Sequence, residues 1–372
     1  MSTTSTSATA DSGSRAGAAP SAAGLLPAGT WVVRIERFGF SARVYRQALV
    51  LGCVLCGLTL AATAVSLTLG DFSMSVTDVL AVVAGEASPM LTHVVVDMRL
   101  PRVLTGIGVG AALAVSGMIL QRLAHNPLVS PDIIGINAGA SAAAVATIVL
   151  FAGTTLQVAG GALTGAVVTA MLLYMMAYRR GVAGYRLVLI GIGLTAMLSS
   201  VTSYLLTRTD IDSAERAMIW LTGSLANRSW SHAATIWLAL AVLVPVTLAL
   251  TRQLRLLQLG DDTAAALGGR VQSARAALLF TSAATAAFAT AVAGPVAFVA
   301  LVAPQIVRRL LRERVVGMLP AMACGALLVI SSDLLARTAF GPSELPVGVI
   351  TGVLGAPYLL YLLTRMNRIG HG

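Results

Sequence analysis

Three arginines are the residues of this chain whose type and spacing best suit the binding of a ligand. Arg99 and Arg102 bracket Pro101 in the stretch RLPR, and Arg337 follows a long apolar run. A guanidinium offers five N–H donors in one plane, which bind a carboxylate or a phosphate through paired hydrogen bonds. The three arginines therefore predict a site for acidic groups.

Proline suits the first turn of a helix, so Arg99 and Arg102 are expected on one face of a helix start. There the positive end of the helix dipole disfavours a cation by about 0.3–1 kcal/mol. Acidic groups from another chain would compensate for that placement, and this is the interpretation that we favour. Local pairing with Asp97 or Asp333, and contact of the long side chains with lipid phosphates, are the alternatives.

The residue types that catalysis and metal binding need do not group together in the sequence. No predicted span carries a central set of ionisable residues, such as ion-coupled transporters usually display, and no nucleophile has a base beside it. The four histidines are far apart, and Cys53, Cys56 and Cys324 are best explained as small apolar residues packed in lipid. The chain has no lysine, so it cannot form the P-loop that holds nucleotide phosphates. We expect no catalytic residue, metal site or cofactor in this chain, and ATP hydrolysis only on another polypeptide.

The elements that must position the arginines are membrane-spanning helices. The 372 residues are 57% hydrophobic and only 11% charged, whereas soluble domains carry about 25% charged residues. A spanning helix needs about 20 mostly apolar residues. The sequence predicts an all-α polytopic membrane protein with ten transmembrane helices, at about 48–69, 102–121, 137–153, 158–178, 187–206, 233–251, 274–293, 296–311, 315–336 and 346–364.

The distribution of basic residues predicts the orientation of these spans. With the N-terminus inside, 19 of the 25 arginines fall on the inner side of the membrane. The six on the outer side are Arg99, Arg102, Arg208, Arg216, Arg228 and Arg337. Loops on the cytoplasmic side carry an excess of basic residues, so both termini are expected in the cytoplasm.

The chain divides into an N-terminal tail and a membrane domain. Residues 1–45 form the predicted cytoplasmic tail, which is largely disordered and ends in a segment at the inner membrane surface. Residues 46–372 form the ten-helix transmembrane domain. Between its sixth and seventh spans, Asp261 and Asp262 begin a short helix that Gly268 and the next glycine end. This helix is the expected contact with a soluble partner, and a simple inner loop is the alternative.

Several motifs together resemble the permease subunits of iron-siderophore and cobalamin importers, the FecCD-type family of ATP-binding-cassette (ABC) importers. The resemblance covers about residues 45–368. It rests on the order and spacing of RLPR with GAALAVSG, NPLVSPDIIG, LGDDTAAALGG, GPVAFVALVAPQIVRR and ELPVGVITGVLGAPYLLYLL. Within the family, the chain is most similar to permeases of the ferric enterobactin type, in NPLVSPDIIG, WLTGSLANRSW and APQIVRRL.

The resemblance implies a multi-pass transport subunit of the bacterial cytoplasmic membrane that is not itself an enzyme. It implies a permease dimer around a central path, a dimer of ABC ATPase subunits that carry ATP and Mg, and an extracytoplasmic siderophore-binding protein. The expected cargo is a ferric siderophore, an enterobactin-like iron chelate. The alternatives are a cobalamin or haem ABC permease, or an ion-coupled secondary transporter. We expect a heterodimer with a second permease subunit, and a homodimer is the alternative.

The resemblance also implies roles for particular residues. Arg99, Arg102 and Arg337 match arginines that receive acidic side chains of the binding protein. The helix that couples to the ATPase maps onto Gly260, Asp261, Asp262, Ala266, Leu267 and Gly268, and the inner gate onto Ala183, Gly184 and Tyr185. One departure is Gln305, where family members often have histidine. Another is Ala-Gly at the gate turn, where cobalamin permeases carry small hydroxyl residues, which weakens the cobalamin alternative.

Overall fold

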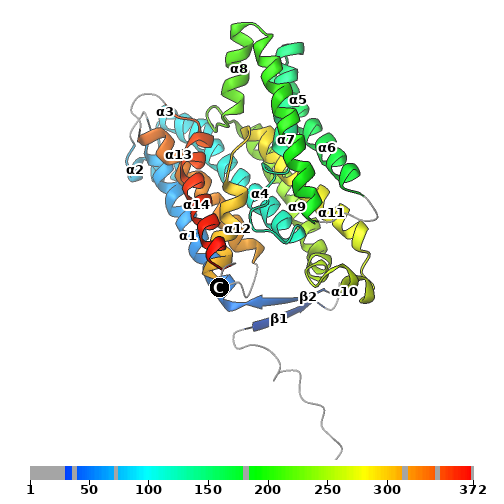
Figure 1. Cartoon of the computed structure of the whole chain (residues 1–372). Coiled ribbons are helices and arrows are strands. Elements are labelled where there is room, and N and C mark those ends of the chain that lie inside the picture. Colours follow the sequence, from blue (N-terminus) through cyan, green and yellow to red (C-terminus); the bar gives the residue numbers. More distant parts are fainter. Residues whose placement is uncertain are drawn as a thin grey trace, which may run out of the picture. The chain divides into compact units, whose positions relative to one another are not determined.

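The computed structural model of the chain describes residues 30–35, 40–70, 74–178, 184–311, 317–339 and 344–369. It divides into two units, residues 1–47 and residues 48–372. Figure 1 shows the elements in chain order.

The first unit contains a β-hairpin that the sequence analysis missed. β1 (Thr30–Ile35) pairs antiparallel with β2 (Phe40–Tyr45), so that Thr30 lies opposite Tyr45. The prediction of an all-α chain is therefore wrong for this segment, which was expected to lie at the membrane surface. Its aromatic and β-branched residues favour extended backbone and explain the strands.

The regular elements described in the second unit are helices. They are α1 (Arg46–Thr68), α2 (Val76–Ala84), α3 (Pro89–Thr92), the π-helix η3 (His93–Arg99), α4 (Leu100–Leu123), α5 (Ile136–Phe151), α6 (Thr155–Ala177), α7 (Gly184–Thr207), α8 (Ile211–Leu221), α9 (Trp230–Leu257), α10 (Asp261–Ala266), α11 (Val271–Ala293), α12 (Val299–Leu310), α13 (Met318–Thr338) and α14 (Val347–Ile369). α8 and α10 lie at opposite ends of this unit (Figure 1).

Eight helices of the described residues are long and apolar enough to cross a membrane. This confirms a polytopic membrane protein. The predicted spans at 137–153 and 296–311 correspond to shorter helices, because α5 has 16 residues and α12 has 12. α12 is short because Gly294 and Pro295 interrupt the helical backbone before it, and it begins only after Phe298, which has a left-handed φ of 64°.

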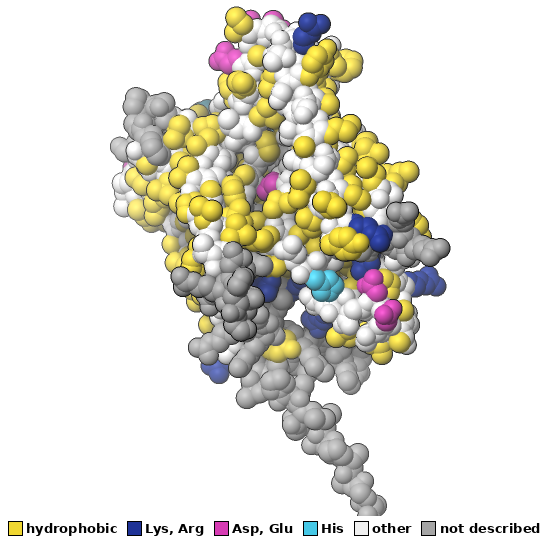
Figure 2. All heavy atoms as spheres, viewed as in Figure 1, with side chains coloured by type: hydrophobic (Ala, Val, Ile, Leu, Met, Phe, Trp, Pro, Cys, Tyr) yellow, Lys and Arg dark blue, Asp and Glu magenta, His cyan; other side chains and the backbone are white. Residues whose placement is uncertain are grey.

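α4 is the central helix of the second unit. It packs against α13, α11, α9 and α12, and most of its length is buried. Gly110 lies against the backbone carbonyl of Gly325 in α13, and Gly117 lies against that of Ala300 in α12, with no room for a Cβ at either glycine. Membrane helices approach closely through such small residues. Around this core, apolar side chains cover the outward faces of the helices (Figure 2), as contact with lipid requires.

Candidate functional site

The helix that carries Arg99 and Arg102 begins earlier than the sequence predicts. A continuous helical segment runs from Pro89 to Leu123, with Ser88 as its N-cap. The two arginines therefore lie inside a helix, and the expectation that they face the positive end of a helix dipole is wrong. The π-helix explains the error: proline clashes with the carbonyl four residues before it in an α-helix, and a wider turn before Pro101 relieves that clash.

Trp230 donates a hydrogen bond to a backbone carbonyl of the π-helix that has no helical donor. The N–H of Leu100 donates to the carbonyl of Val95, five residues back. Pro101 has no N–H for the next carbonyl, that of Val96, and the indole Nε1 of Trp230 donates to it instead at 3.1 Å. Trp230 begins α9, so this bond fixes the start of α9 against the π-helix.

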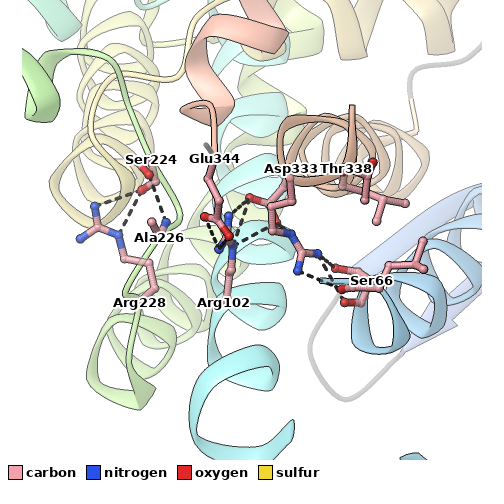
Figure 3. Close-up of polar contacts among 11 residues, drawn as sticks. Ser66, Arg102, Ser224, Ala226, Arg228, Asp333, Thr338 and Glu344 are labelled. Carbon is pink, nitrogen blue, oxygen red and sulfur yellow. Dashed lines mark hydrogen bonds and ion pairs between the residues drawn. The ribbon is translucent and has the colours of Figure 1, made fainter. Parts of the chain in front are cut away.

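Arg102 is held between two carboxylates of the same chain (Figure 3). Its Nε donates to both oxygens of Asp333 at 3.2 Å, and its Nη2 donates to Asp333 Oδ1 at 3.0 Å. Its Nη1 donates to Glu344 Oε2 at 2.9 Å. The Asp333 side chain is only 2% exposed, whereas that of Glu344 is 35% exposed. Arg102 therefore has one buried partner and one partner at the surface.

The other two arginines bind the last carbonyls of α1. Arg337 is 5% exposed, forms an ion pair with Asp333 at 3.3 Å and donates to the carbonyls of Ser66 and Leu69. Arg99 donates through Nη1 to the carbonyl of Leu67. The carbonyls at a helix C-terminus lack partners within the helix and carry partial negative charge. The arginines satisfy them and tie α1 to α4 and α13.

The structure thus brings Arg99, Arg102 and Arg337 together, but not as side chains without local partners. The chain itself supplies carboxylates to Arg102 and Arg337, and the docking of acidic groups from another chain stays a prediction. Of the two local partners considered, Asp333 forms ion pairs with Arg102 and Arg337. Asp97 instead pairs with His93, with 2.8 Å between Asp97 Oδ2 and His93 Nδ1. We refer to Arg99, Arg102 and Arg337 with Asp333 and Glu344 as the outer arginine network, and among the described residues this network reaches solvent at Glu344, whose side chain is 35% exposed.

At the other end of the molecule, α10 occupies the predicted coupling segment. Gly260, with a φ of 97°, precedes the helix, and Gly268, with a φ of 78°, follows it. Asp261 accepts two hydrogen bonds from Arg275 of α11, at 2.7 and 3.1 Å. This pair attaches α10 to a long helix. Among the remaining predicted coupling residues, Asp262, Ala266 and Leu267 are exposed.

Of the predicted gate residues, Ala183 lies outside the described residues. Gly184 is the first residue of α7. The exposed side chain of Tyr185 has the guanidinium of Arg186 over its ring, 5.7 Å from the centroid. Tyr185 and Arg186 thus place an aromatic ring and a cation in the first turn of α7.

A polar junction between α5, α11 and α12 was missed by the sequence analysis. Asp132, in the turn before α5, accepts hydrogen bonds from the Asn137 side chain and the backbone N–H of Phe298. Thr290 of α11 in turn donates to Asn137 at 3.1 Å. An acidic residue between Pro131 and an Ala/Gly-rich helix was the signal that could have pointed to this junction.

Gln305 occupies a second buried polar contact. Its Nε2 donates to Gln121 Oε1 at 2.5 Å and to the carbonyl of Pro127 at 3.2 Å. Gln121 donates to the carbonyl of Leu301 at 3.1 Å. The neighbouring carbonyl, that of Ala300, has no helical donor because Pro304, four residues later, lacks an N–H. Glutamine at 305 therefore supplies a buried donor that ties α12 to α4.

The described residues contain no group of three or more His, Cys, Asp or Glu side chains that could hold a metal ion. Cys53, Cys56 and Cys324 are free thiols. Within this part of the chain, the concentrated polar chemistry is the arginine network at one end, α10 at the other and the two buried junctions between helices.

Comparison with known proteins agrees with this picture. The pattern of the FecCD transport family matches residues 58–365. The chain is 39% identical over 320 residues to the ferric enterobactin transport system permease protein FepG of Escherichia coli K12, covering 86% of this chain and 95% of that protein. It is 41% identical to the achromobactin transport system permease protein CbrC of Dickeya dadantii, covering 83% and 90%. A solved metal-chelate type ABC transporter in an inward-facing conformation superimposes with a TM-score of 0.76, at 28% identity, over 85% of this chain and 99% of that one.

Proposed function

The chain belongs to the FecCD transport family, and on that premise we propose that it carries a ferric siderophore of the enterobactin class across the membrane. The family places it among permease subunits of ABC importers for iron chelates, which are not enzymes, in the bacterial cytoplasmic membrane. The observation that supports this cargo is the 39% identity to the ferric enterobactin permease of Escherichia coli over 95% of its length. The exclusively arginine-based positive charge also suits an anionic chelate.

On this proposal the protein has ten membrane crossings, with α5 and α12 as short crossings and both termini in the cytoplasm. A helix of 16 residues spans about 24 Å at 1.5 Å per residue, less than a bilayer core of about 30 Å. The turns before α5 and α12 would complete these crossings. Irregular backbone at such depth is tolerated where protein surrounds it, and the hydrogen bonds of Asp132 with Asn137 and with the backbone N–H of Phe298 join the two turns.

We assign the outer arginine network of Arg99, Arg102 and Arg337 to the docking of an extracytoplasmic siderophore-binding protein. A carboxylate of the partner would meet Arg102 at the edge now occupied by Glu344, where the network reaches solvent. Arg99 and Arg337 would act chiefly by holding α1, α4 and α13 in register beneath that edge.

We assign α10, with Gly260, Asp261, Asp262, Ala266, Leu267 and Gly268, to the contact with a dimer of ABC ATPase subunits that bind ATP and Mg. Its exposed face would meet the ATPase, and the Asp261–Arg275 pair would pass movement to α11. The inner gate is assigned to Ala183, Gly184 and Tyr185. A second permease subunit of different sequence would complete the path, with a homodimer as the alternative arrangement.

Uptake of radiolabelled iron in a strain that lacks this gene tests the cargo. Ferric enterobactin uptake should be restored by the chain together with its partner subunits, and competition by unlabelled ferric citrate, haem or cobalamin should be weak. Equal restoration of haem or cobalamin uptake would contradict the assignment. Uptake by this chain alone, driven by a proton or sodium gradient, would indicate the secondary transporter instead.

A further inference from the structure

Two backbone hydrogen bonds join three segments of the membrane domain that lie far apart in the sequence. One segment follows α8, one connects α11 to α12, and one begins α14. The N–H of Ser224 donates to the carbonyl of Ala293 at 2.8 Å, and the N–H of Gly348 donates to the carbonyl of Gly223 at 3.1 Å. We refer to residues 222–225, 293–296 and 345–348 as the backbone crossing.

Glycine permits the close approach of these segments. A Cβ on Gly348 would overlap the carbonyl oxygen of Thr222, and a Cβ on Gly223 would overlap that of Pro295. Gly223 and Gly294 also have left-handed φ values of 67° and 76°, which side chains with a Cβ disfavour. Backbone therefore lies directly on backbone, with no flexible side chain between the segments to absorb a displacement. Such close packing transmits a shift of one segment to the next.

A short piece of chain, residues 344–348, connects the backbone crossing to the outer arginine network, and we refer to it as the strap. Glu344 pairs with Arg102 at the solvent edge of the network, and three residues separate Glu344 from Gly348. The first of them, Leu345, donates its N–H to the carbonyl of Ala336 in α13 at 3.2 Å. The second is a proline, whose ring fixes φ and stiffens the backbone. The strap is thus held at the network by one end and at the crossing by the other.

α8 is held less firmly by the rest of the chain than the other helices at the crossing. Only Ser213 and Ala217 of its 11 residues are buried, and it packs against α5 and α7. Gly223, which accepts the bond from Gly348, lies two residues beyond Leu221, the last residue of α8. α11, by contrast, is buried along most of its length. Elements with few buried side chains move more readily than core helices, so α8 is the helix that responds when the strap shifts.

We propose that Gly223 and Gly348 position α8 in response to docking, so that a binding protein that meets Arg102 moves α8 through the strap. This inference rests on the proposed docking at the outer arginine network. A partner carboxylate on Arg102 displaces Glu344, the strap shifts, and the contact between Gly348 and Gly223 carries that shift to the end of α8. α8 packs in turn against α7, which begins at the predicted inner gate. The two glycines are positioning residues, because they act through α8 and not by contact with the cargo.

The test compares Gly348→Ala with the matched control Gly352→Ala, one turn later in α14. An added Cβ at Gly348 has no room beside Thr222, whereas a Cβ at Gly352 meets no atom within 4 Å. Each chain is reconstituted with the second permease subunit, the ATPase subunits and a binding protein loaded with ferric enterobactin. Gly348→Ala should keep the affinity for the binding protein within about twofold of the wild type and lower the stimulation of ATP hydrolysis by that protein at least about fivefold. Gly352→Ala should change neither quantity.

A distance measurement keeps the inference testable if Gly348→Ala fails to fold. In a chain whose native cysteines are replaced by serine, spin labels are attached at the exposed positions Glu215 of α8 and Leu335 of α13. Docking of the binding protein should change the distance between these labels by about 2 Å. Labels at Leu335 and at exposed Leu58 of α1 form the control pair, whose distance should stay the same.

Three results would overturn the inference. They are wild-type stimulation of ATP hydrolysis in Gly348→Ala, an unchanged distance between α8 and α13 on docking, and equal losses of affinity and stimulation in Gly348→Ala, which would indicate a structural role alone. Docking to the wild type separates these failures from a failure of the proposed function. A wild-type complex that binds no binding protein would overturn the proposed function as well, whereas normal docking with any of the three results overturns this inference alone.

Discussion

Replacing Asp333 with asparagine should destabilise the membrane domain more than any other single polar substitution in the outer arginine network. Its carboxylate is almost fully buried and lies between Arg102 and Arg337. Asparagine keeps the shape of the side chain but removes the charge and turns one acceptor into a donor facing guanidinium N–H groups.

The magnitude follows from the burial of both partners. Removing one member of a buried ion pair leaves an uncompensated charge and costs about 3–5 kcal/mol. Glu344→Gln is the matched control, because it removes a charge from the same arginine at a position where the carboxylate is 35% exposed. Solvent screens the Arg102–Glu344 ion pair, so Glu344→Gln should lower the free energy of unfolding by less than about 1 kcal/mol.

The free energy of unfolding, measured by denaturant titration of the purified chain in mild detergent, distinguishes the two variants. In the double variant Arg102→Gln/Asp333→Asn, the loss should be smaller than the sum of the two single losses, because the uncompensated charge on Arg102 is removed as well. The reasoning would be refuted if Asp333→Asn unfolded within 1 kcal/mol of the wild type, or if Glu344→Gln cost as much as Asp333→Asn.

Two further predictions concern helix packing and the π-helix. Gly117→Ala should lower the free energy of unfolding by about 1–3 kcal/mol, because a Cβ has no room against Ala300. Gly57→Ala, at a position where no other atom lies near a Cβ, should leave the free energy of unfolding unchanged. Equal losses in the two variants would contradict the role of Gly117 in helix packing. Trp230→Phe should lower the free energy of unfolding by about 1 kcal/mol, because the carbonyl of Val96 loses the indole N–H that donates to it. Amide hydrogen exchange at the start of α9 should also become faster. An unchanged exchange rate would contradict the role of the Trp230–Val96 hydrogen bond.

The sequence predicts the membrane-spanning architecture well because hydrophobic runs of spanning length are a local property. The sequence is a poorer guide to where a helix begins or ends when an interruption of the helical hydrogen bonding is involved. Pro101 indicated a helix start, but a π-helix lets the helix continue through it from Pro89. The hairpin at Thr30–Tyr45 depends on pairing between two short strands, which composition alone does not reveal.

The candidate site was predicted in its residues but not in its contacts. Arg99, Arg102 and Arg337 do meet, yet their partners come from distant parts of the chain: Asp333 and Glu344 are 231 and 242 residues from Arg102. Only the packing of α1, α4 and α13 brings these groups together. The short helix α10 was predictable because glycines and acidic residues mark its two ends locally.

Transport in proteoliposomes tests the account most directly. The chain is reconstituted with a second permease subunit, ATPase subunits and binding protein, and entry of radiolabelled ferric enterobactin is measured with and without ATP. The account predicts uptake that requires ATP and all the partners and is unaffected by collapse of ion gradients. Uptake that persists without ATP and follows a proton or sodium gradient would contradict it.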